Sequence, residues 1–340
     1  MLKLSQDKSK WRQSFLDQNK KFQKYFHMFV FAYVYLMIAL TIPTNFSVTA
    51  PNKTRIANTM INITDIQQSN HFRTVSVLTT NRITGFARMI YELNDAFLVS
   101  PLSYSESILT GEEANLRGNI QKQASFEQSL ITAYTLAKNV KPEITINYQF
   151  SGMLVDFRSL SNPEVLIGDL IVDIDHLAFN DYELMGNYFI ESNAPMTLSI
   201  LRNGTLIDVL VTKNADSIFR FYPKYQIISA NPSYTLPGNL ILTSGPSAGM
   251  MYTLSIYFGL IEFEGLDEDI VGTGTIRYNN EVGNIGGLRQ KVYTAIKEGI
   301  NHFIIPSDQY QEVSDLGHLI NIYPVVSIME AIEVVYEISA

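Results

Sequence analysis

The sequence contains no cysteine, and only 17% of its 340 residues carry a charge. Without cysteine the chain has no disulfide bonds, no thiol nucleophile and no Cys-ligated metal. The formal net charge is −8, so a nucleic-acid surface, which needs excess positive charge, is not expected. The zinc motif HExxH and the ATP-binding loop GxxxxGK[ST] are also absent from the sequence. We therefore expect no metal, no cofactor, no ATP dependence and no nucleic-acid partner.

Residues 26–42 form the longest apolar stretch, FHMFVFAYVYLMIALTI, with no formally charged side chain if His27 is neutral. Its length is near the lower limit for a helix that crosses a bilayer. Seven basic residues precede the stretch and two follow it closely, namely Lys3, Lys8, Lys10, Arg12, Lys20, Lys21 and Lys24 before it and Lys53 and Arg55 after it.

This charge asymmetry predicts a topology, because cytoplasmic flanks carry the excess of Lys and Arg. Residues 1–24 are then a cytoplasmic basic leader, residues 25–43 a single transmembrane helix, and the rest of the chain lies outside the cell. A cleaved signal peptide is the alternative, since SVTAPN offers a small-x-small site, and a buried core helix is a second. The long basic leader and the length of the span favour a retained anchor.

The region after the anchor, residues 44–145, is expected to begin as a polar linker, rich in Asn and Thr to about residue 65. The alternation in TVSVLTT (74–80) predicts a strand, and the apolar spacing in SFEQSLITAYTLAKNV (125–140) predicts an amphipathic helix. This region is the N-terminal part of the extracellular portion.

Two domains are expected to follow. Residues 146–220 contain short strand-like runs separated by turns, with one helical stretch, DYELMGNYFIES, among them. After a hinge near Pro232–Pro237, residues 230–340 alternate strands and helices in a compact unit. The sequence thus predicts an α+β protein with an N-terminal transmembrane helix, a β-rich domain and a C-terminal α/β domain.

The stretch ILTSGPSAGMM (241–251) places one serine, Ser247, just before a long apolar run. After Gly245 and Pro246 a buried helix is expected, and its first N–H groups have no partner within the helix. Such donors, from Gly245, Ser247 and Ala248, are what an oxyanion hole requires. By itself the pattern also fits an ordinary glycine-proline loop that starts a core helix.

A serine nucleophile needs a base, and none of the five histidines lies in a motif that indicates catalysis. The helix predicted in GGLRQKVYTAIKEGI (286–300) places Lys291 at the margin of its apolar stripe. Burial lowers a lysine pKa, and a shift from ~10.4 to about 7 corresponds to roughly 4–5 kcal/mol. The alternative is a lysine whose stem lies along the edge of the core while its ammonium reaches water.

GPSAG followed by GGLRQK resembles the Ser-Lys dyad of the Lon family of proteases. The resemblance implies that Ser247 is the nucleophile and Lys291 the general base. Between them, VGTGTIRYNNEVGNIGG resembles the strand pair of that family, which implies that Thr273 supports the lysine. Lon sequences usually carry an acidic residue where this chain has Ser244, so a role for that acid is in doubt here.

Upstream stretches resemble the membrane-anchored, PDZ-containing Lon-like proteases of bacteria. They are FEQSLITAYTLAKN and the pair SGMLVDF…NPEVLIGDLIVDID, although His176 replaces the usual glycine of the PDZ pattern. The resemblance implies a PDZ-like domain in residues 146–220 and a Lon-type proteolytic domain in residues 230–340. A PDZ domain binds a peptide along a sheet edge, here predicted at Gly152, Met153 and Leu154.

These features together predict a membrane-anchored, ATP-independent serine endopeptidase of the cell membrane, with its catalytic domain extracellular. Its expected partners are protein or peptide substrates and the lipid bilayer, and the sequence leaves a homo-oligomer open. The alternative is a non-catalytic, membrane-anchored peptide-binding scaffold with a degenerate protease fold.

Overall fold

The computed structural model describes residues 2–192, 195–214, 216–236 and 245–340, with side chains from residue 15 onward. Its fold is α+β, as expected from the sequence. The chain divides into two compact units: unit 1 comprises Met1–Val48 and Thr79–Leu102, and unit 2 comprises Thr49–Leu78 and Ser103–Ala340.

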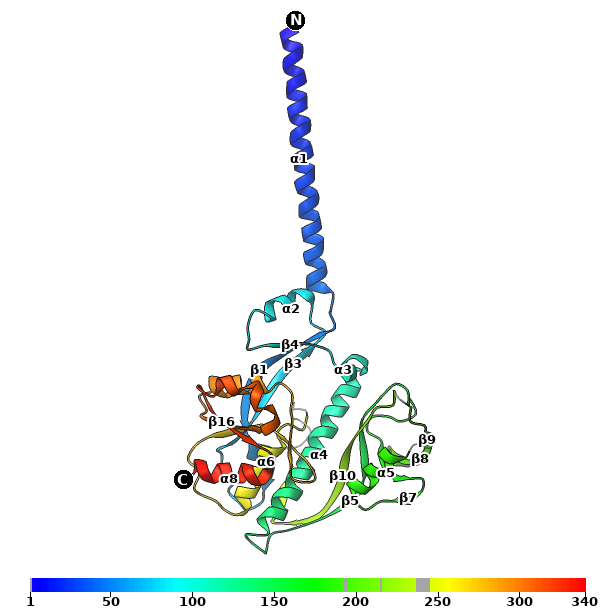
Figure 1. Ribbon diagram of the computed structural model, residues 1–340, viewed down its shortest axis with the longest axis vertical. Coiled ribbons are helices and arrows are strands. Elements are labelled where there is room, and N and C mark those ends of the chain that lie inside the picture. The colour runs from blue at the N-terminus through cyan, green and yellow to red at the C-terminus, as the bar shows by residue number, and fades with distance from the viewer. Residues whose placement is uncertain (1, 193–194, 215, 237–244) are drawn as a thin grey trace. The chain divides into compact units, whose positions relative to one another are not determined.

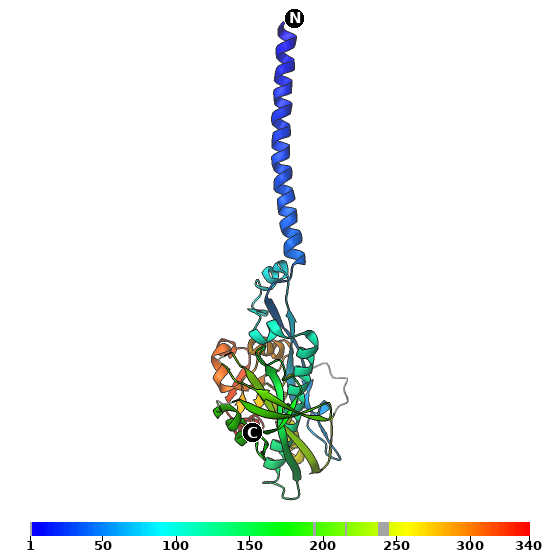
Figure 2. The same ribbon diagram turned by 90° about the vertical axis from the view of Figure 1, so that its right-hand side faces the viewer.

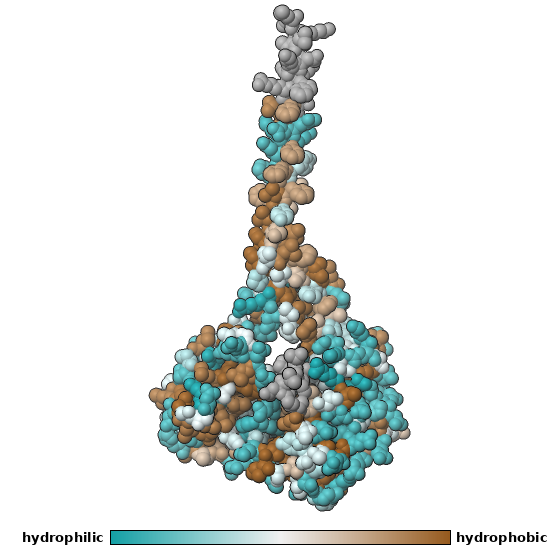
Figure 3. All heavy atoms as spheres, turned by 180° about the vertical axis from the view of Figure 1, so that it is seen from behind, coloured by the Kyte–Doolittle hydropathy of each residue, from teal (hydrophilic) through white to brown (hydrophobic). Residues whose placement is uncertain are grey.

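Unit 1 is dominated by one helix, α1 (Leu2–Thr41), followed by the start of β1 (Phe46–Ile56), by α2 (Gly85–Tyr91) and by β4 (Leu98–Pro101). Within Phe15–Thr41, an 18-residue window has a mean hydropathy of 1.4, and none of that window is buried. Apolar side chains gather on the visible face of α1 toward its C-terminal end (Figure 3). By length and composition this helix is able to cross a membrane, and a signal sequence would have the same properties.

The main sheet of unit 2 has the strand order β16-β15-β12-β3-β1, and β4 follows β1. The bounds are β3 (Phe72–Asn81), β12 (Ile270–Gly272), β15 (His302–Pro306) and β16 (Asn321–Val325). β12 pairs in parallel with both β3 and β15. The strand predicted at 74–80 is therefore present, and it joins a sheet with strands nearly at the other end of the sequence.

The polar linker expected at residues 43–65 is not present. This segment forms β1, η1 (Ala57–Thr59) and β2 (Asn62–Ile63), which pairs with β11 (Tyr234–Thr235). Its apolar residues are buried in the main core, among them Met60, Ile61 and Ile63. The prediction failed because the Asn and Thr residues were counted as loop formers, whereas apolar residues alternate with them along the strands.

Alternation along the sheet strands produces two buried faces. Ile270 and Ile304 face the core that contains α4 (Gly111–Ala137), α6 (Gly249–Leu260) and α8 (Ile328–Ile338). Val271 and Phe303 face the opposite core, which contains α7 (Leu288–Lys297) and the short helices η2 (Ser307–Glu312) and η3 (Ser314–Leu316). Helices on both faces of a largely parallel sheet make the C-terminal part an α/β unit.

Helix α4 is longer than predicted and packs along both α6 and the second sheet (Figure 1). It begins at residue 111 because Thr110 and Glu113 form a capping box. The first half of α4 is largely polar. The spacing of apolar residues therefore predicted only the second half of the helix. A shorter helix, α3 (Tyr104–Ile108), precedes it.

The second sheet of unit 2 has the order β10-β5-β6-β8-β9, with β7 paired to β6. Its elements are β5 (Thr145–Arg158), β6 (Leu170–Ile174), β7 (Leu177–Ala178), α5 (Tyr182–Glu191), β8 (Met196–Arg202), β9 (Thr205–Val211) and β10 (Phe219–Asn231). The strands are drawn in green facing the viewer in Figure 2. The β-rich region and the helix at DYELMGNYFIES are thus present, with a core of their own.

The peptide-binding edge predicted at Gly152, Met153 and Leu154 is wrong, because β5 is an interior strand. Met153 pairs with Ile171 of β6 on one side and with Pro223 of β10 on the other. Its main chain is therefore not open to an added peptide. β10 returns along β5 after the domain, and its proline fits an edge strand, which does not need every N–H.

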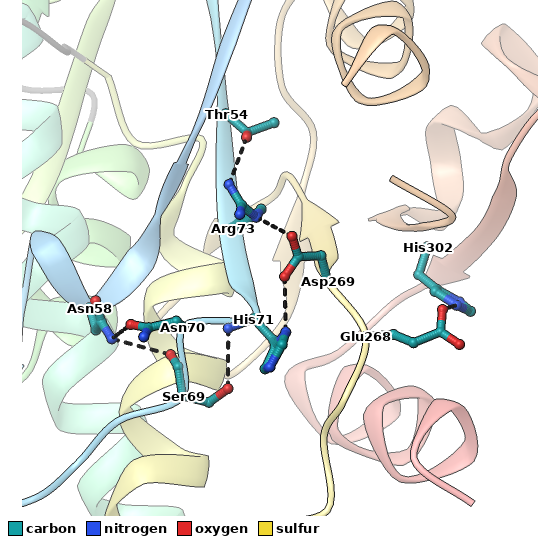
Figure 4. Close-up of polar contacts among 9 residues, drawn as sticks. All are labelled: Thr54, Asn58, Ser69, Asn70, His71, Arg73, Glu268, Asp269 and His302. Carbon is teal, nitrogen blue, oxygen red and sulfur yellow. Dashed lines mark hydrogen bonds and ion pairs between the residues drawn. The ribbon is translucent and has the colours of Figure 1, made fainter. Parts of the chain in front are cut away.

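Polar side chains join β3 to the segment that leads into β12 (Figure 4). Arg73 donates to Asp269 at 2.7 Å, and the ring of His71 lies 2.9 Å from the other oxygen of that carboxylate. Nearby, His302 contacts Glu268 at 2.7 Å. These two histidines therefore stabilise the sheet. Their contacts hold the start of β12, the strand that ends just before Thr273.

Candidate active site

The loop before α6 is held against α4. Gly245 has φ of +90°, a conformation that favours glycine, and its N–H donates to the carbonyl of Gly118 at 3.2 Å. The Ser125 hydroxyl donates to the carbonyl of Pro246 at 3.3 Å. Ser247 follows, and the helix itself begins at Gly249. The serine thus lies immediately before the first turn, where the sequence predicted it.

Gly249 is required by close packing at the helix start. A Cβ atom at this position would lie 2.8 Å from the Ser125 hydroxyl and 2.9 Å from a methyl group of Ile276. Ile276 belongs to β13 (Thr275–Ile276), which pairs with β14 (Val282–Gly283) as the predicted strand pair. The small residues of the PSAG stretch therefore let α4, α6 and this hairpin meet beside Ser247.

Lys291 lies on α7 and is 3% exposed. Its Nζ is 2.9 Å from the Ser247 Oγ and 3.0 Å from the Thr273 Oγ1. The structure therefore brings together the three side chains that the sequence singled out. Two of them are neutral hydroxyls, so the lysine gains hydrogen bonds here but no opposite charge.

Burial lowers the pKa of Lys291 to about 7. The cause is desolvation, which disfavours the ammonium form inside the protein. Near neutral pH a large fraction of this lysine is a free amine. A free amine accepts the proton of a hydroxyl at hydrogen-bond distance, so this pair has the chemistry of a nucleophile and its base.

Thr273 is fully buried and holds both partners. Its hydroxyl donates to the carbonyl of Ser247 at 3.0 Å, and the N–H of Gly274 donates to the same carbonyl at 2.8 Å. Since its only hydroxyl proton is used there, the Thr273 oxygen accepts from Lys291. One N–H of the lysine is thereby directed at Thr273, and once the amine is neutral its lone pair is free to accept from the Ser247 hydroxyl at 2.9 Å.

The predicted oxyanion donors are only partly available. Gly245 is excluded in this arrangement, because its N–H already donates to Gly118. The next N–H groups along α6 are also in use, since Gly249 donates to Pro246. Within the described ranges, the N–H groups of Ser247 and Ala248 have no hydrogen-bond acceptor. Those two donors lie next to the serine hydroxyl, where an oxyanion would form. Ser244 lies outside the described residues.

A cavity of about 460 Å³ opens over Ser247 and Lys291. Its remaining wall comes mostly from β1 and β3, whose lining residues the sequence analysis missed: Asn52, Lys53, Arg55, Thr74, Val75, Ser76, Val77 and Leu78. Met60, Lys122 of α4, Tyr252 of α6 and Gly286 also line it. No local motif marks these strands, and only their alternating pattern could have indicated that they belong to the sheet.

Comparison with known proteins bears on the same part of the chain. Residues 221–339 match the Lon protease (S16) C-terminal proteolytic domain. The chain is 30% identical over 103 residues to a Lon protease of Mycoplasma mycoides, a match over 30% of this chain and 13% of that protein. It is 36% identical over 81 residues to the Lon protease of Desulfatibacillum aliphaticivorans, over 24% of this chain and 10% of that protein.

An archaeal Lon protease of Archaeoglobus fulgidus is 29% identical over 127 residues, covering 36% of this chain and 20% of that protein. The chain therefore spans only a small part of the curated relatives that it matches. Residues 221–339, which match the family, contain Ser247, Thr273 and Lys291. The match of residues 221–339 to the Lon proteolytic domain implies a serine peptidase.

Proposed function

We propose that this protein is a membrane-anchored, ATP-independent serine endopeptidase that uses Ser247 as nucleophile and Lys291 as general base. The observation that carries the proposal is the 2.9 Å separation between the lysine Nζ and the serine Oγ, with a buried lysine whose pKa is lowered to about 7. The implied serine peptidase of residues 221–339 supports the same reaction class.

The chemistry follows from this geometry. As the Ser247 Oγ attacks the peptide carbonyl carbon, its proton passes to the Lys291 Nζ. The oxygen of the tetrahedral intermediate takes the negative charge and accepts from the N–H groups of Ser247 and Ala248. The lysine then gives its proton to the leaving amine as the C–N bond breaks. A water molecule, deprotonated by the same lysine, hydrolyses the acyl-enzyme and restores the serine.

The wall of the cavity suits an extended substrate. β3 pairs with β12 only through Thr74 and then continues to Asn81, so the following residues line the cavity beyond that pairing. A peptide chain added along such a main chain would pass beside Ser247. The substrate class proposed is therefore a polypeptide in extended conformation.

The β-rich domain is proposed to bind substrate or partner chains in the manner of a PDZ domain. With β5 covered on both sides, the end strands of this sheet are β10 and β9. The proposed place for an added strand is β9, which pairs with β8 on its other side. Leu206 and Leu210 on β9 are 61% and 66% exposed. They would contact alternate side chains of the added strand.

Anchoring by α1 is proposed from its apolar composition and from the seven-to-two excess of basic residues on its N-terminal side. The catalytic unit would then face the outside of the cell. Protease added to intact cells should digest unit 2, and a unit 2 protected until lysis would contradict this topology.

The alternative function, a non-catalytic scaffold, predicts no peptide hydrolysis. The test is cleavage of an unstructured fluorogenic peptide library by the full chain in detergent micelles, beside Ser247→Ala. The enzyme proposal requires hydrolysis that the substitution removes. Equal hydrolysis by both proteins, or none by either, would favour the scaffold.

A further inference from the structure

The cavity over Ser247 has a one-sided charge. The charged side chains that line it are Lys53, Arg55, Lys122 and Lys291, and no Asp or Glu lines it in the described part of the chain. This is unusual for a sequence with 33 acidic and 25 basic residues. The excess of cations is therefore a property of this cavity and is opposite in sign to the protein as a whole.

Strand geometry explains how two of these cations reach the cavity. Lys53 and Arg55 are two residues apart on β1, so their side chains point to the same face. Thr54, between them, points to the other face, where it is buried and donates to Glu298. The charge of Arg55 also reaches an opposite wall: burial raises the pKa of Tyr252, and Arg55 opposes that rise.

Several other cations of unit 2 are neutralised by carboxylates. Arg73 pairs with Asp269, and Arg289 pairs with Asp315. Among the described residues, Lys53 and Arg55 have no such partner. Their positive field is thus directed into the cavity, and low-dielectric walls concentrate a field of this kind.

We propose that the cavity selects substrates with acidic side chains close to the scissile bond, and that Lys53 and Arg55 determine this specificity. The proposal rests on the proposed peptidase function and names its substrate class. Glutamate or aspartate within a few residues of the cleaved bond would pair with these cations, whereas lysine or arginine there would be repelled. Pairs of this kind, partly open to water, contribute about 0.2–1 kcal/mol each by their usual range, which is a few-fold in kcat/KM.

The test uses three fluorogenic peptides that differ only in the residues flanking the cleaved bond, which are Glu, Gln or Lys. With the full chain in micelles, kcat/KM should fall in that order, by about tenfold across the series. Raising the salt concentration from about 0.05 M to about 0.5 M should shrink the ratio, because screening shortens the range of the interaction.

Substitution should then reverse the preference. Lys53→Glu with Arg55→Glu should favour the Lys peptide over the Glu peptide. The matched control, Lys138→Glu with Lys297→Glu, changes the net charge equally at two exposed positions outside the cavity lining and should keep the original order. Thermal melts of both double variants check that they fold.

Equal cleavage of the Glu and Lys peptides, or an order that the cavity variants leave unchanged, would overturn the proposal. If no peptide is cleaved, the peptidase function fails, and the charge proposal is judged by binding. Fluorescence anisotropy with Ser247→Ala should still give tighter binding of the Glu peptide than of the Lys peptide, and equal affinities would overturn it.

Discussion

Two buried ionisable groups of unit 2 differ in their surroundings. Asp156, on β5, is 2% exposed and accepts from Arg117 at 3.0 Å and from Gln121 at 2.8 Å. Burial raises its pKa, and these two partners oppose the rise. Lys291 is buried to the same degree but contacts only hydroxyl oxygens.

This difference in contacts distinguishes a side chain that stabilises the fold from one that is able to take part in proton transfer. Asp156 of β5 accepts from the guanidinium of Arg117 and the amide of Gln121, both on α4. Its negative charge is therefore compensated by the same contacts that join the strand to the helix. Lys291 has no opposite charge, and its lowered pKa is a cost to stability that a purely structural side chain would avoid. A buried charge beside an opposite charge maintains the fold, whereas a buried base that contacts only hydroxyl groups is available to take a proton.

The largest effect expected is from Lys291→Arg. The guanidinium keeps the positive charge but cannot give up its proton near neutral pH, so turnover should fall about 10³-fold. Peptide hydrolysis by the full chain in micelles measures this. Lys297→Arg, on the same helix but exposed, is the matched control and should keep activity. More than a few per cent of the original activity in Lys291→Arg would show that another group is the base.

Activity should also follow the protonation of Lys291. Only the free amine accepts the serine proton, so kcat/KM should rise with pH and level off above the lysine pKa of about 7. At pH 5 the rate should be about 100-fold below the plateau, a tenfold fall for each unit. A profile that is flat from pH 5 to 8, or that rises only near pH 10, would contradict the buried-amine mechanism.

The comparison with Asp156 predicts stability changes of opposite sign. The folded-state pKa of Lys291, about 7, lies below its ordinary value of 10.5. The folded protein is therefore penalised fully below pH 7 and progressively less up to pH 10.5. Lys291→Met should raise the free energy of unfolding at pH 6 by on the order of 3 kcal/mol, and this gain should shrink as pH rises through that window.

Asp156→Leu should instead lower the free energy of unfolding by about 1–3 kcal/mol, because it leaves the partly buried donors of Arg117 and Gln121 without this acceptor. Denaturant titrations at pH 6 and pH 10 measure both variants. Destabilisation by both, or a Lys291→Met gain that does not change with pH, would remove the distinction between the two groups.

The smallest effect is expected at Thr273, which contacts the amine of Lys291 and does not line the cavity. Thr273→Val removes the hydroxyl that accepts from Lys291, so kcat should fall about tenfold with little change in KM. The midpoint of the pH profile should also move, and Thr273→Ser should restore both. If Thr273→Val lost activity only because it unfolds, the folded fraction that remains would keep the original midpoint of the pH profile. An unchanged midpoint would therefore contradict a positioning role for Thr273.

The sequence predicted the candidate site better than it predicted the walls around it. Ser247, Thr273 and Lys291 each lie in a short motif. Ser247 precedes a helix, Thr273 precedes a hairpin and Lys291 lies on a helix face, so the local backbone already implies how each side chain is oriented. Lys53 and Arg55 have no such context. They lie on β1, which reaches the cavity because β1 lies beside β3 in the sheet and β3 pairs with β12, joining Phe72 to Ile270 across most of the chain.

The same limit explains the errors in the β-rich domain. Its strands and its helix follow from local alternation and spacing, and they are present. Which strand lies at the edge depends on the return of β10, a pairing that connects residue 219 to residue 158 and residue 231 to residue 145. Local patterns contain no information on such partners.

The length of β10 has a consequence for motion. Phe219, Phe221 and Tyr225 pack against the core of the β-rich domain, while Ile227 and Ala230 pack against the main core. The ladder with β5 runs through both regions and ends at Asn231, just before the hinge expected near Pro232–Pro237, of which Pro237 lies outside the described residues. Swinging the β-rich domain away from the cavity would first break main-chain hydrogen bonds between β10 and β5. Each protein molecule should therefore keep its β-rich domain and Ser247 at a nearly constant separation.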